Sequence, residues 1–191
     1  MSKSILIAGG TGFIGYHLAK KCLNLNWSVT SLSTSLPKKK RKLKKVSYKI
    51  CDISNYNQII KNIKPDFNYV VNLAGYVDHS NKLKTMKSHY IGCKNLSKFF
   101  LNSKIKKFIQ VGSSIEYGKI KSPQSERKFS KKTFSIYGKA KLLSTLFSQN
   151  LYKKFNFPVT ILRLYLVYGP YQDINRVIPI TISNALKDKK F

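Results

Sequence analysis

The segment at residues 5–15, with the sequence ILIAGGTGFIG, constrains the fold of this chain more than any other. Its first four residues are apolar and predict a short buried strand. Gly9, Gly12 and Gly15 then follow at intervals of three, and the apolar spacing of a helix continues beyond them. A strand that breaks at glycine and resumes as a helix predicts a phosphate-binding turn. One glycine permits the tight turn, one lets a pyrophosphate approach the backbone, and one lets the helix pack close to the strand. The N–H groups at the start of the helix would face the anion.

Beyond this turn, the apolar residues alternate between the spacing of strands and the spacing of helices. Strands are predicted at residues 5–8, 27–32, 46–50, 68–73, 107–111 and 159–167, and helices at residues 12–25, 55–63, 85–102, 137–155 and 174–187. This alternation implies parallel strands joined by right-handed crossovers. We therefore expect an α/β fold of the Rossmann-like type. It would be a doubly wound parallel sheet with helices on both faces and a ligand crevice at the carboxyl ends of its strands.

The chain is strongly basic, with 36 Lys and Arg against 7 Asp and Glu among 191 residues, for a net charge of +29. Such a charge can attract nucleic acids or anionic membranes. Lysine supplies most of it, however, and is spread over nearly every segment, and no known nucleic-acid-binding module is visible. We therefore expect no specific nucleic-acid partner, with binding through charge as the alternative. The field would still steer an anionic substrate toward the protein.

Two further features limit the location and the chemistry of the protein. No uninterrupted apolar run is long enough to cross a bilayer, so we expect no membrane span. Cys22, Cys51 and Cys93 are scattered without the spacing of metal ligands. This pattern favours a reducing cytoplasm and predicts no metal site.

The glycine spacing is GxxGxxG, with a further glycine at Gly10. It resembles the N-terminal motif of the extended short-chain dehydrogenases/reductases, the NAD-dependent epimerase/dehydratase family of nucleotide-sugar enzymes. Two later segments also resemble this family, namely Asp52-Ile53 after the third strand and NLAG at residues 72–75 after the fourth. The resemblance implies that NAD or NADP is bound by Gly9, Gly12, Phe13, Ile14, Gly15, Ser33, Asp52, Ile53, Leu73, Ala74, Gly75, Tyr137 and Lys141.

The end of the second strand bears on the choice between the two cofactors. NAD-selective folds carry an acidic residue there to bind the ribose hydroxyls, whereas this chain has Ser33, followed by Lys38, Lys39, Lys40 and Arg41. A hydroxyl with basic neighbours would tolerate or bind a 2′-phosphate. The sequence therefore favours NADP, with NAD as the alternative if the basic run is only a solvated loop.

Tyr137 and Lys141 form a YxxxK pattern, in which a spacing of four places both side chains on one helix face. A cation about 4 Å from the phenol, at an effective dielectric constant of about 20, would favour tyrosinate by roughly 4 kcal/mol, or about 3 pKa units. The phenol would then titrate near the operating pH, where proton transfer is efficient. By the resemblance, Tyr137 exchanges a proton with the sugar as hydride passes to or from nicotinamide, and Lys141 also holds the nicotinamide ribose.

The family carries a Ser or Thr four residues before the tyrosine that is Tyr117 here, and this residue hydrogen-bonds the reacting oxygen. By the resemblance Ser113 takes this role and completes the catalytic set, with the neighbouring Ser114 as the alternative. In the family's 4,6-dehydratases an acidic pair follows that residue. Those positions are Ser114 and Ile115 here, and we expect the displaced Glu116 to point away on a strand-like segment. This pattern favours a 4-keto reductase or a 4-epimerase acting on a nucleotide-diphosphate sugar.

The chain departs from the family pattern at two positions. His89 stands three residues before Gly92, where family members usually have Asn, and Leu166 replaces the substrate-binding Asn of the RxxNxYGP motif. We expect residues 1–165 to form an NAD(P)-binding domain that carries the catalytic residues, and residues 166–191 to begin a truncated substrate-binding lobe. The alternative is a non-catalytic or fragmentary NAD(P)-binding module. The resemblance also allows a homodimer formed through two helices of the domain.

Overall fold

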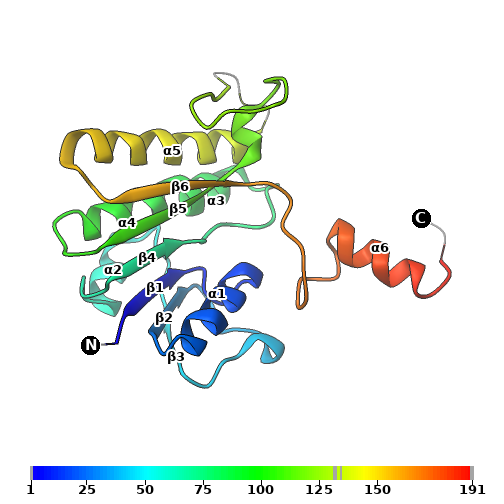
Figure 1. Cartoon of the computed structure of the whole chain (residues 1–191), viewed down its shortest axis with the longest axis horizontal. Coiled ribbons are helices and arrows are strands. Elements are labelled where there is room, and N and C mark those ends of the chain that lie inside the picture. The colour runs from blue at the N-terminus through cyan, green and yellow to red at the C-terminus, as the bar shows by residue number, and fades with distance from the viewer. Residues whose placement is uncertain (1, 131–132, 134, 190–191) are drawn as a thin grey trace.

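The computed structural model describes residues 2–130, 133 and 135–189, and within these ranges six strands form one sheet (Figure 1). The strands are β1 (Ser4–Ala8), β2 (Ser28–Ser33), β3 (Val46–Ile50), β4 (Tyr69–Asn72), β5 (Lys107–Ser113) and β6 (Val159–Leu164). Their order is β3-β2-β1-β4-β5-β6, and every neighbouring pair is parallel. This order confirms the predicted doubly wound sheet, whose direction of winding reverses between β1 and β4.

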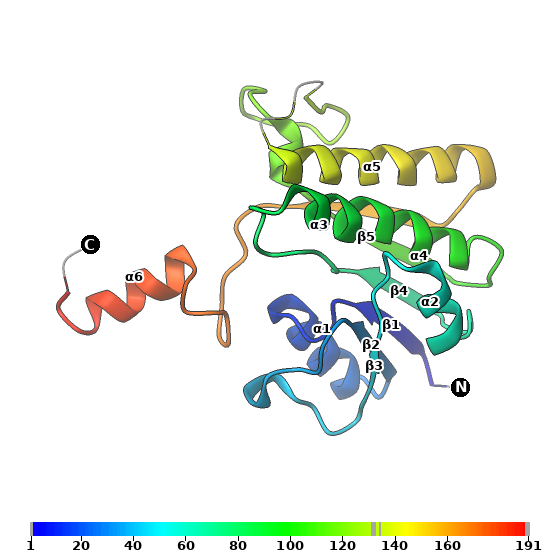
Figure 2. The ribbon, with the colours of Figure 1, turned by 180° about the vertical axis from the view of Figure 1, so that it is seen from behind.

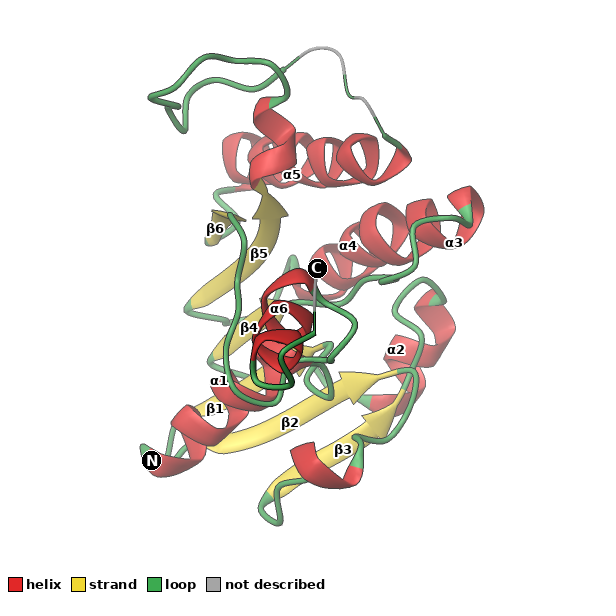
Figure 3. Cartoon of the chain, turned by 90° about the vertical axis from the view of Figure 1, so that its right-hand side faces the viewer, coloured by secondary structure: helices red, strands yellow, loops and turns green. Residues whose placement is uncertain are grey.

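Helices cover both faces of the sheet, as Figure 3 shows in a view onto its edge. The helices are α1 (Phe13–Asn24), α2 (Tyr56–Asn62), α3 (Lys82–Met86), α4 (Gly92–Phe100), α5 (Ile136–Phe155) and α6 (Val177–Ala185). Side chains of alternate residues in β1 point to opposite faces of the sheet. Ile5 and Ile7 pack in a cluster with residues of α1, and Leu6 and Ala8 pack in a cluster with residues of α2, α4 and α5. Strand β1 is therefore buried on both sides, which explains its continuous apolar run.

Three segments differ from the predictions. The helix predicted at residues 85–102 is instead α3, a π-helical turn at Lys87–Ile91, and α4. The segment after β5 is a 3-10 turn, Ser114–Tyr117, and is not strand-like. The basic run after β2 contains a 3-10 turn, Lys39–Arg41, and it is more than a solvated loop because the Arg41 side chain is only 4% exposed.

Helix α6 projects away from the sheet, beyond the end of the segment that follows β6 (Figure 2). None of its residues is buried. The division predicted at residues 165 and 166 lies directly after β6, and it stays a prediction. No helix in the described ranges combines the length and the apolar content needed to cross a bilayer.

Candidate active site

A cleft of about 1030 Å³ opens at the carboxyl ends of the strands, on the edge of the sheet that faces the viewer in Figure 3. Every site residue predicted from the sequence lines this cleft. They are Gly9, Gly12, Phe13, Ile14, Gly15, Ser33, Asp52, Ile53, Leu73, Ala74, Gly75, Ser113, Tyr137 and Lys141. The topology thus brings together residues that follow five different strands.

The glycine turn after β1 has the shape that a pyrophosphate site requires. Gly9 has a φ of +79°, and a Cβ there would come within 2.8 Å of the backbone nitrogen of Ala74. A Cβ on Gly15 would lie 2.5 Å from the carbonyl oxygen of Gly9, so only glycine lets α1 pack this close to the turn. Helix α1 starts after Gly12 with no side-chain cap, and the N–H groups of its first turn can therefore serve an anion. These features fit the diphosphate of a dinucleotide.

Ser113, Tyr137 and Lys141 come together where β5 and α5 line the cleft. Ser113 ends β5, and the other two lie one turn apart on α5, which packs against β5. A hydrogen bond joins the side chains of Ser113 and Tyr137. The Lys141 ammonium lies 5.7 Å from the centroid of the Tyr137 ring and donates a hydrogen bond of 2.8 Å to the carbonyl oxygen of Val111.

The prediction that Lys141 lowers the pKa of Tyr137 is wrong for this structure. Burial raises the pKa of the phenol, the hydrogen bond from Ser113 opposes this rise, and the negative charge of Glu116 adds to it. Lys141 is itself so buried that its pKa falls to about 8, although the charges of Glu116 and Cys93 oppose the fall. The ammonium is directed to the carbonyl oxygen of Val111, and burial of the phenol is the largest cause of the shift in its pKa.

Two histidines flank Tyr137, and neither contact was predicted from the sequence. The exposed His79 stacks on the Tyr137 ring with centroids 4.1 Å apart and planes 12° apart, and His89 meets the same ring edge-on at 5.0 Å. His89 is 7% exposed, and burial lowers its pKa to about 3, so it is neutral near pH 7. Its position before Gly92, where the family has Asn, was the one available signal. The π-helical turn that carries it is a structure often found at functional sites.

Glu116 supports the site from outside the cleft. Its side chain is 0% exposed and lies in the 3-10 turn after β5. One carboxylate oxygen accepts the backbone N–H of Ser113 at 2.8 Å, and the other accepts the Thr145 hydroxyl at 2.7 Å and Nε of Arg163 at 3.1 Å. The carboxylate therefore holds the backbone of Ser113 in place, and it does so from a 3-10 turn and not from the strand-like segment that was predicted.

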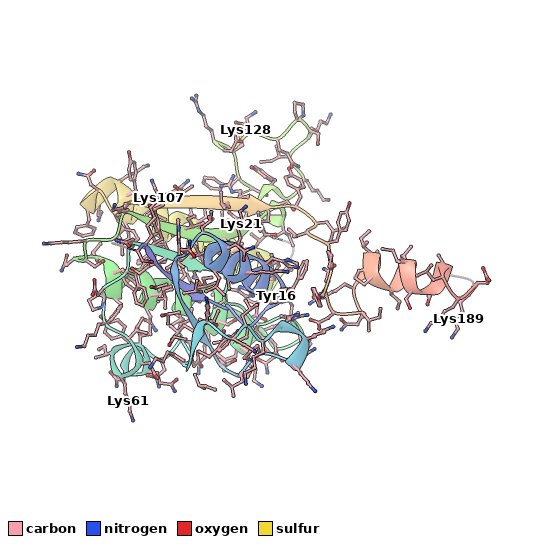
Figure 4. All side chains as sticks on the ribbon, turned by 60° about the horizontal axis from the view of Figure 1, so that its bottom comes forward. Tyr16, Lys21, Lys61, Lys107, Lys128 and Lys189 are labelled. Atoms are coloured by element: carbon pink, nitrogen blue, oxygen red, sulfur yellow. The ribbon has the colours of Figure 1, made fainter. Side chains whose placement is uncertain are left out.

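The positive charge is distributed over several parts of the surface. Figure 4 shows Lys61, Lys107, Lys128 and Lys189 at widely separated points on the periphery of the molecule. Within the described ranges, no group of three or more His, Cys, Asp or Glu side chains could hold a metal ion. The three cysteines are free and buried.

The sheet order, the glycine turn and the cleft define a dinucleotide-binding α/β protein. The sequence profile of the NAD dependent epimerase/dehydratase family matches residues 5–191, and the chain belongs to this family. Family membership confirms the resemblance on which the sequence predictions relied.

Several relatives are nucleotide-sugar enzymes by name. A dTDP-D-glucose 4,6-dehydratase of Dictyostelium discoideum is 30% identical over an alignment of 214 residues. The alignment covers 98% of this chain and 49% of the relative. A UDP-glucuronic acid 4-epimerase of Bacillus cereus, crystallised with UDP-glucuronic acid and NAD, is 25% identical with a TM-score of 0.82, covering 97% of this chain and 64% of that one. A UDP-glucose 4-epimerase of Thermotoga maritima, crystallised with UDP-glucose, shares the fold at a TM-score of 0.87 and 23% identity, covering 98% and 64%. The chain therefore spans from about half to just under two thirds of the length of these proteins.

Proposed function

We propose that this chain is the dinucleotide-binding and catalytic part of an NAD(P)-dependent nucleotide-sugar enzyme, a 4-keto reductase or a 4-epimerase. The observation that carries the proposal is the meeting of Ser113, Tyr137 and Lys141 in the same cleft as the glycine turn. In this proposal residues 1–165 hold the cofactor and the catalytic groups, and residues 166–191 begin the substrate-binding lobe. The names of the relatives support the substrate class, a nucleotide-diphosphate sugar.

Different residues of the cleft would bind different parts of the cofactor. The turn at Gly9, Gly12 and Gly15 would hold the diphosphate, and Asp52 would lie beside the adenine. When bound, the nicotinamide supplies hydride transfer to or from the sugar. The glycine turn fits NAD and NADP equally, because the diphosphate is common to both.

Tyr137 would move the proton that accompanies hydride transfer. Because burial raises its pKa, the phenol is protonated near pH 7 and can donate its proton to a sugar carbonyl oxygen, as reduction requires. Ser113 would donate a hydrogen bond to the same oxygen and hold it beside the phenol. Lys141 would hold the nicotinamide ribose through its ammonium group, which is charged below its pKa of about 8.

A dehydratase is the less suitable reaction, although the Dictyostelium relative bears that name. Neither Ser114 nor Ile115 carries a carboxylate that could drive the elimination of water. The nearest carboxylate, Glu116, is fully buried and is paired with Arg163. These side chains favour a reductase or an epimerase.

A non-catalytic NAD(P)-binding module is the second candidate. It is favoured by His79, whose ring stacks on Tyr137, and by Leu166, which replaces the substrate-binding Asn of the family. Such a module would bind dinucleotide without turnover.

Binding and turnover separate the two candidates. The chain would be titrated with NADH and NADPH by calorimetry and then assayed with UDP- and dTDP-linked sugars and their 4-keto forms. We expect Tyr137→Phe to keep dinucleotide binding and to lower turnover by about 100-fold or more. Tyr152→Phe is the matched control, because Tyr152 lies on the same helix and is 58% exposed.

Each outcome has a distinct meaning. Turnover that survives Tyr137→Phe would contradict the role of the phenol. Dinucleotide binding without turnover on any sugar would favour the module, and absence of dinucleotide binding would refute both candidates.

A further inference from the structure

Two residues of the basic run after β2 face the cleft, and both are engaged by one acid. Lys38 and Arg41 line the cleft, whereas Lys39 and Lys40 do not. The Lys38 ammonium lies 2.8 Å from Oδ1 of Asp173, and Nη2 of Arg41 lies 3.0 Å from the same oxygen. Asp173 itself lines the cleft, so all three charges belong to its wall.

Asp173 is held in place by a strap, which we define as residues 169–173. The strap follows β6 and crosses to the loop between β2 and β3, as the orange segment of Figures 1 and 2 shows. Nε and Nη2 of Arg41 donate to the carbonyl oxygen of Tyr171 at 3.1 and 2.8 Å. On the other side, the Tyr171 ring packs against Tyr16 with centroids 5.3 Å apart, and Nε2 of His17 lies 2.8 Å from the carbonyl oxygen of Pro170. The carboxylate is thus fixed by contacts on both sides.

The position of this ion cluster matters for the 2′-phosphate of NADP. Ser33 ends β2 and lines the same cleft, at the point where dinucleotide folds bind the adenosine ribose. A phosphate there needs cations with free hydrogen-bond donors. Hydrogen bonds from Lys38 and Arg41 hold the pKa of Asp173 below its usual range, so Asp173 is ionised near neutral pH and repels a second anion.

We propose that Asp173 is a specificity-determining residue that disfavours NADP relative to NAD by engaging Lys38 and Arg41. The inference rests on the proposed function, since it concerns the cofactor of that site. It opposes the prediction of NADP made from the sequence. That prediction considered only the basic residues after β2, because Asp173 is far from them in the sequence. By the same reasoning, loss of the Asp173 carboxylate alone, without any added cation, would improve the binding of NADP.

The test compares nucleotide affinities of the unchanged chain and of Asp173→Asn. NAD, NADP, 5′-ADP and adenosine 2′,5′-bisphosphate would each be titrated by calorimetry at low salt. We expect Asp173→Asn to tighten the two 2′-phosphorylated ligands by roughly five- to tenfold and to leave the other two within about twofold. Asp66→Asn is the control, because Asp66 is an exposed acid outside the cleft and its loss changes the net charge equally.

A second variant tests the cation. Adding Lys38→Gln to Asp173→Asn should remove most of the gain, because Lys38 would supply the new phosphate contact. Binding of both cofactors with an unchanged NADP-to-NAD ratio in Asp173→Asn would overturn the inference and leave the proposed function intact. If neither cofactor bound the unchanged chain, the proposed function would fail, and the inference would fail with it.

Discussion

Replacement of Glu116 by Gln should destabilise the whole domain. The Glu116 carboxylate is fully buried and accepts hydrogen bonds from Ser113, Thr145 and Arg163. Gln keeps the shape but loses the charge and one acceptor oxygen, and its amide group faces at least one of these donors. The Arg163 side chain, which is 7% exposed, would lose its only carboxylate partner among the described residues.

The size of the effect follows from the burial of this pair. Removing one partner of a buried ion pair costs about 3–5 kcal/mol. Arg163 also donates to the carbonyl oxygens of Glu126 and Lys128, which compensate part of the loss. We therefore expect Glu116→Gln to lower the free energy of unfolding by about 3 kcal/mol. In a domain of this size the melting temperature should fall by roughly 6–12 °C.

Urea and thermal unfolding would measure this change against a matched substitution. Glu126→Gln is the control, because the Glu126 side chain is exposed and only its backbone carbonyl meets Arg163. We expect that control to change stability by less than about 0.5 kcal/mol. A double variant, Glu116→Gln with Arg163→Met, should recover part of the loss since the unpaired charge is gone. The reasoning is refuted if Glu116→Gln unfolds within about 1 kcal/mol of Glu126→Gln.

Three further predictions test the site. Lys141 has a folded pKa of about 8, below its ordinary 10.5, so burial of its charge destabilises the fold below pH 8 and this penalty is relieved as pH rises from 8 to 10.5. Lys141→Met should therefore stabilise the chain at pH 7 by about 2 kcal/mol, an advantage that shrinks above pH 8 in urea titrations. Gly15→Ala places a Cβ 2.5 Å from a backbone oxygen and should cost about 2–3 kcal/mol. Gly12→Ala, at 3.2 Å, should cost less stability than Gly15→Ala and weaken dinucleotide binding in calorimetry. Gly75→Ala places a Cβ 2.0 Å from the His89 ring and should cost about 1–3 kcal/mol, which His89→Ala should largely restore in the double variant.

Other results would contradict these three predictions. A Lys141→Met variant that is less stable at pH 7 than at pH 9.5, relative to the unchanged chain, would have the wrong sign. Equal losses of stability for Gly15→Ala and Gly12→Ala would mean that the turn relaxes around either methyl group. Additive losses for Gly75→Ala and His89→Ala would show that the two positions do not share space.

The sequence predicted the sheet well because its signals are local. The strand predicted at residues 46–50 is β3 as observed, since alternating residues between turns determine it. The helix predicted at residues 137–155 begins one residue earlier, after the Ser135 cap. The glycine spacing and the strand order together placed the cleft correctly.

The features that sequence reasoning missed depend on distant partners. Burial of Arg41 requires Asp173 and Tyr171, which follow β6, the strand at the opposite edge of the sheet from β3. The YxxxK spacing predicts that Tyr137 and Lys141 lie on the same face of a helix. It does not predict where the ammonium points, because that depends on the carbonyl oxygen of Val111 on β5. The π-helical turn at Lys87–Ile91 leaves no mark in the apolar spacing.

The exposed apolar side chains of α6 and of Leu186, the residue that follows it, have a consequence for handling the protein. Val177, Ile180, Ile182 and Leu186 are each more than two fifths exposed, at 69%, 44%, 54% and 81%. Such a stripe promotes self-association between copies, and the net charge of +29 opposes it by mutual repulsion. Repulsion weakens as added salt shortens the Debye length to about 3 Å at 1 M. Colloidal stability of the chain should therefore decline with ionic strength, and dilute buffers are the better choice for storage and crystallisation.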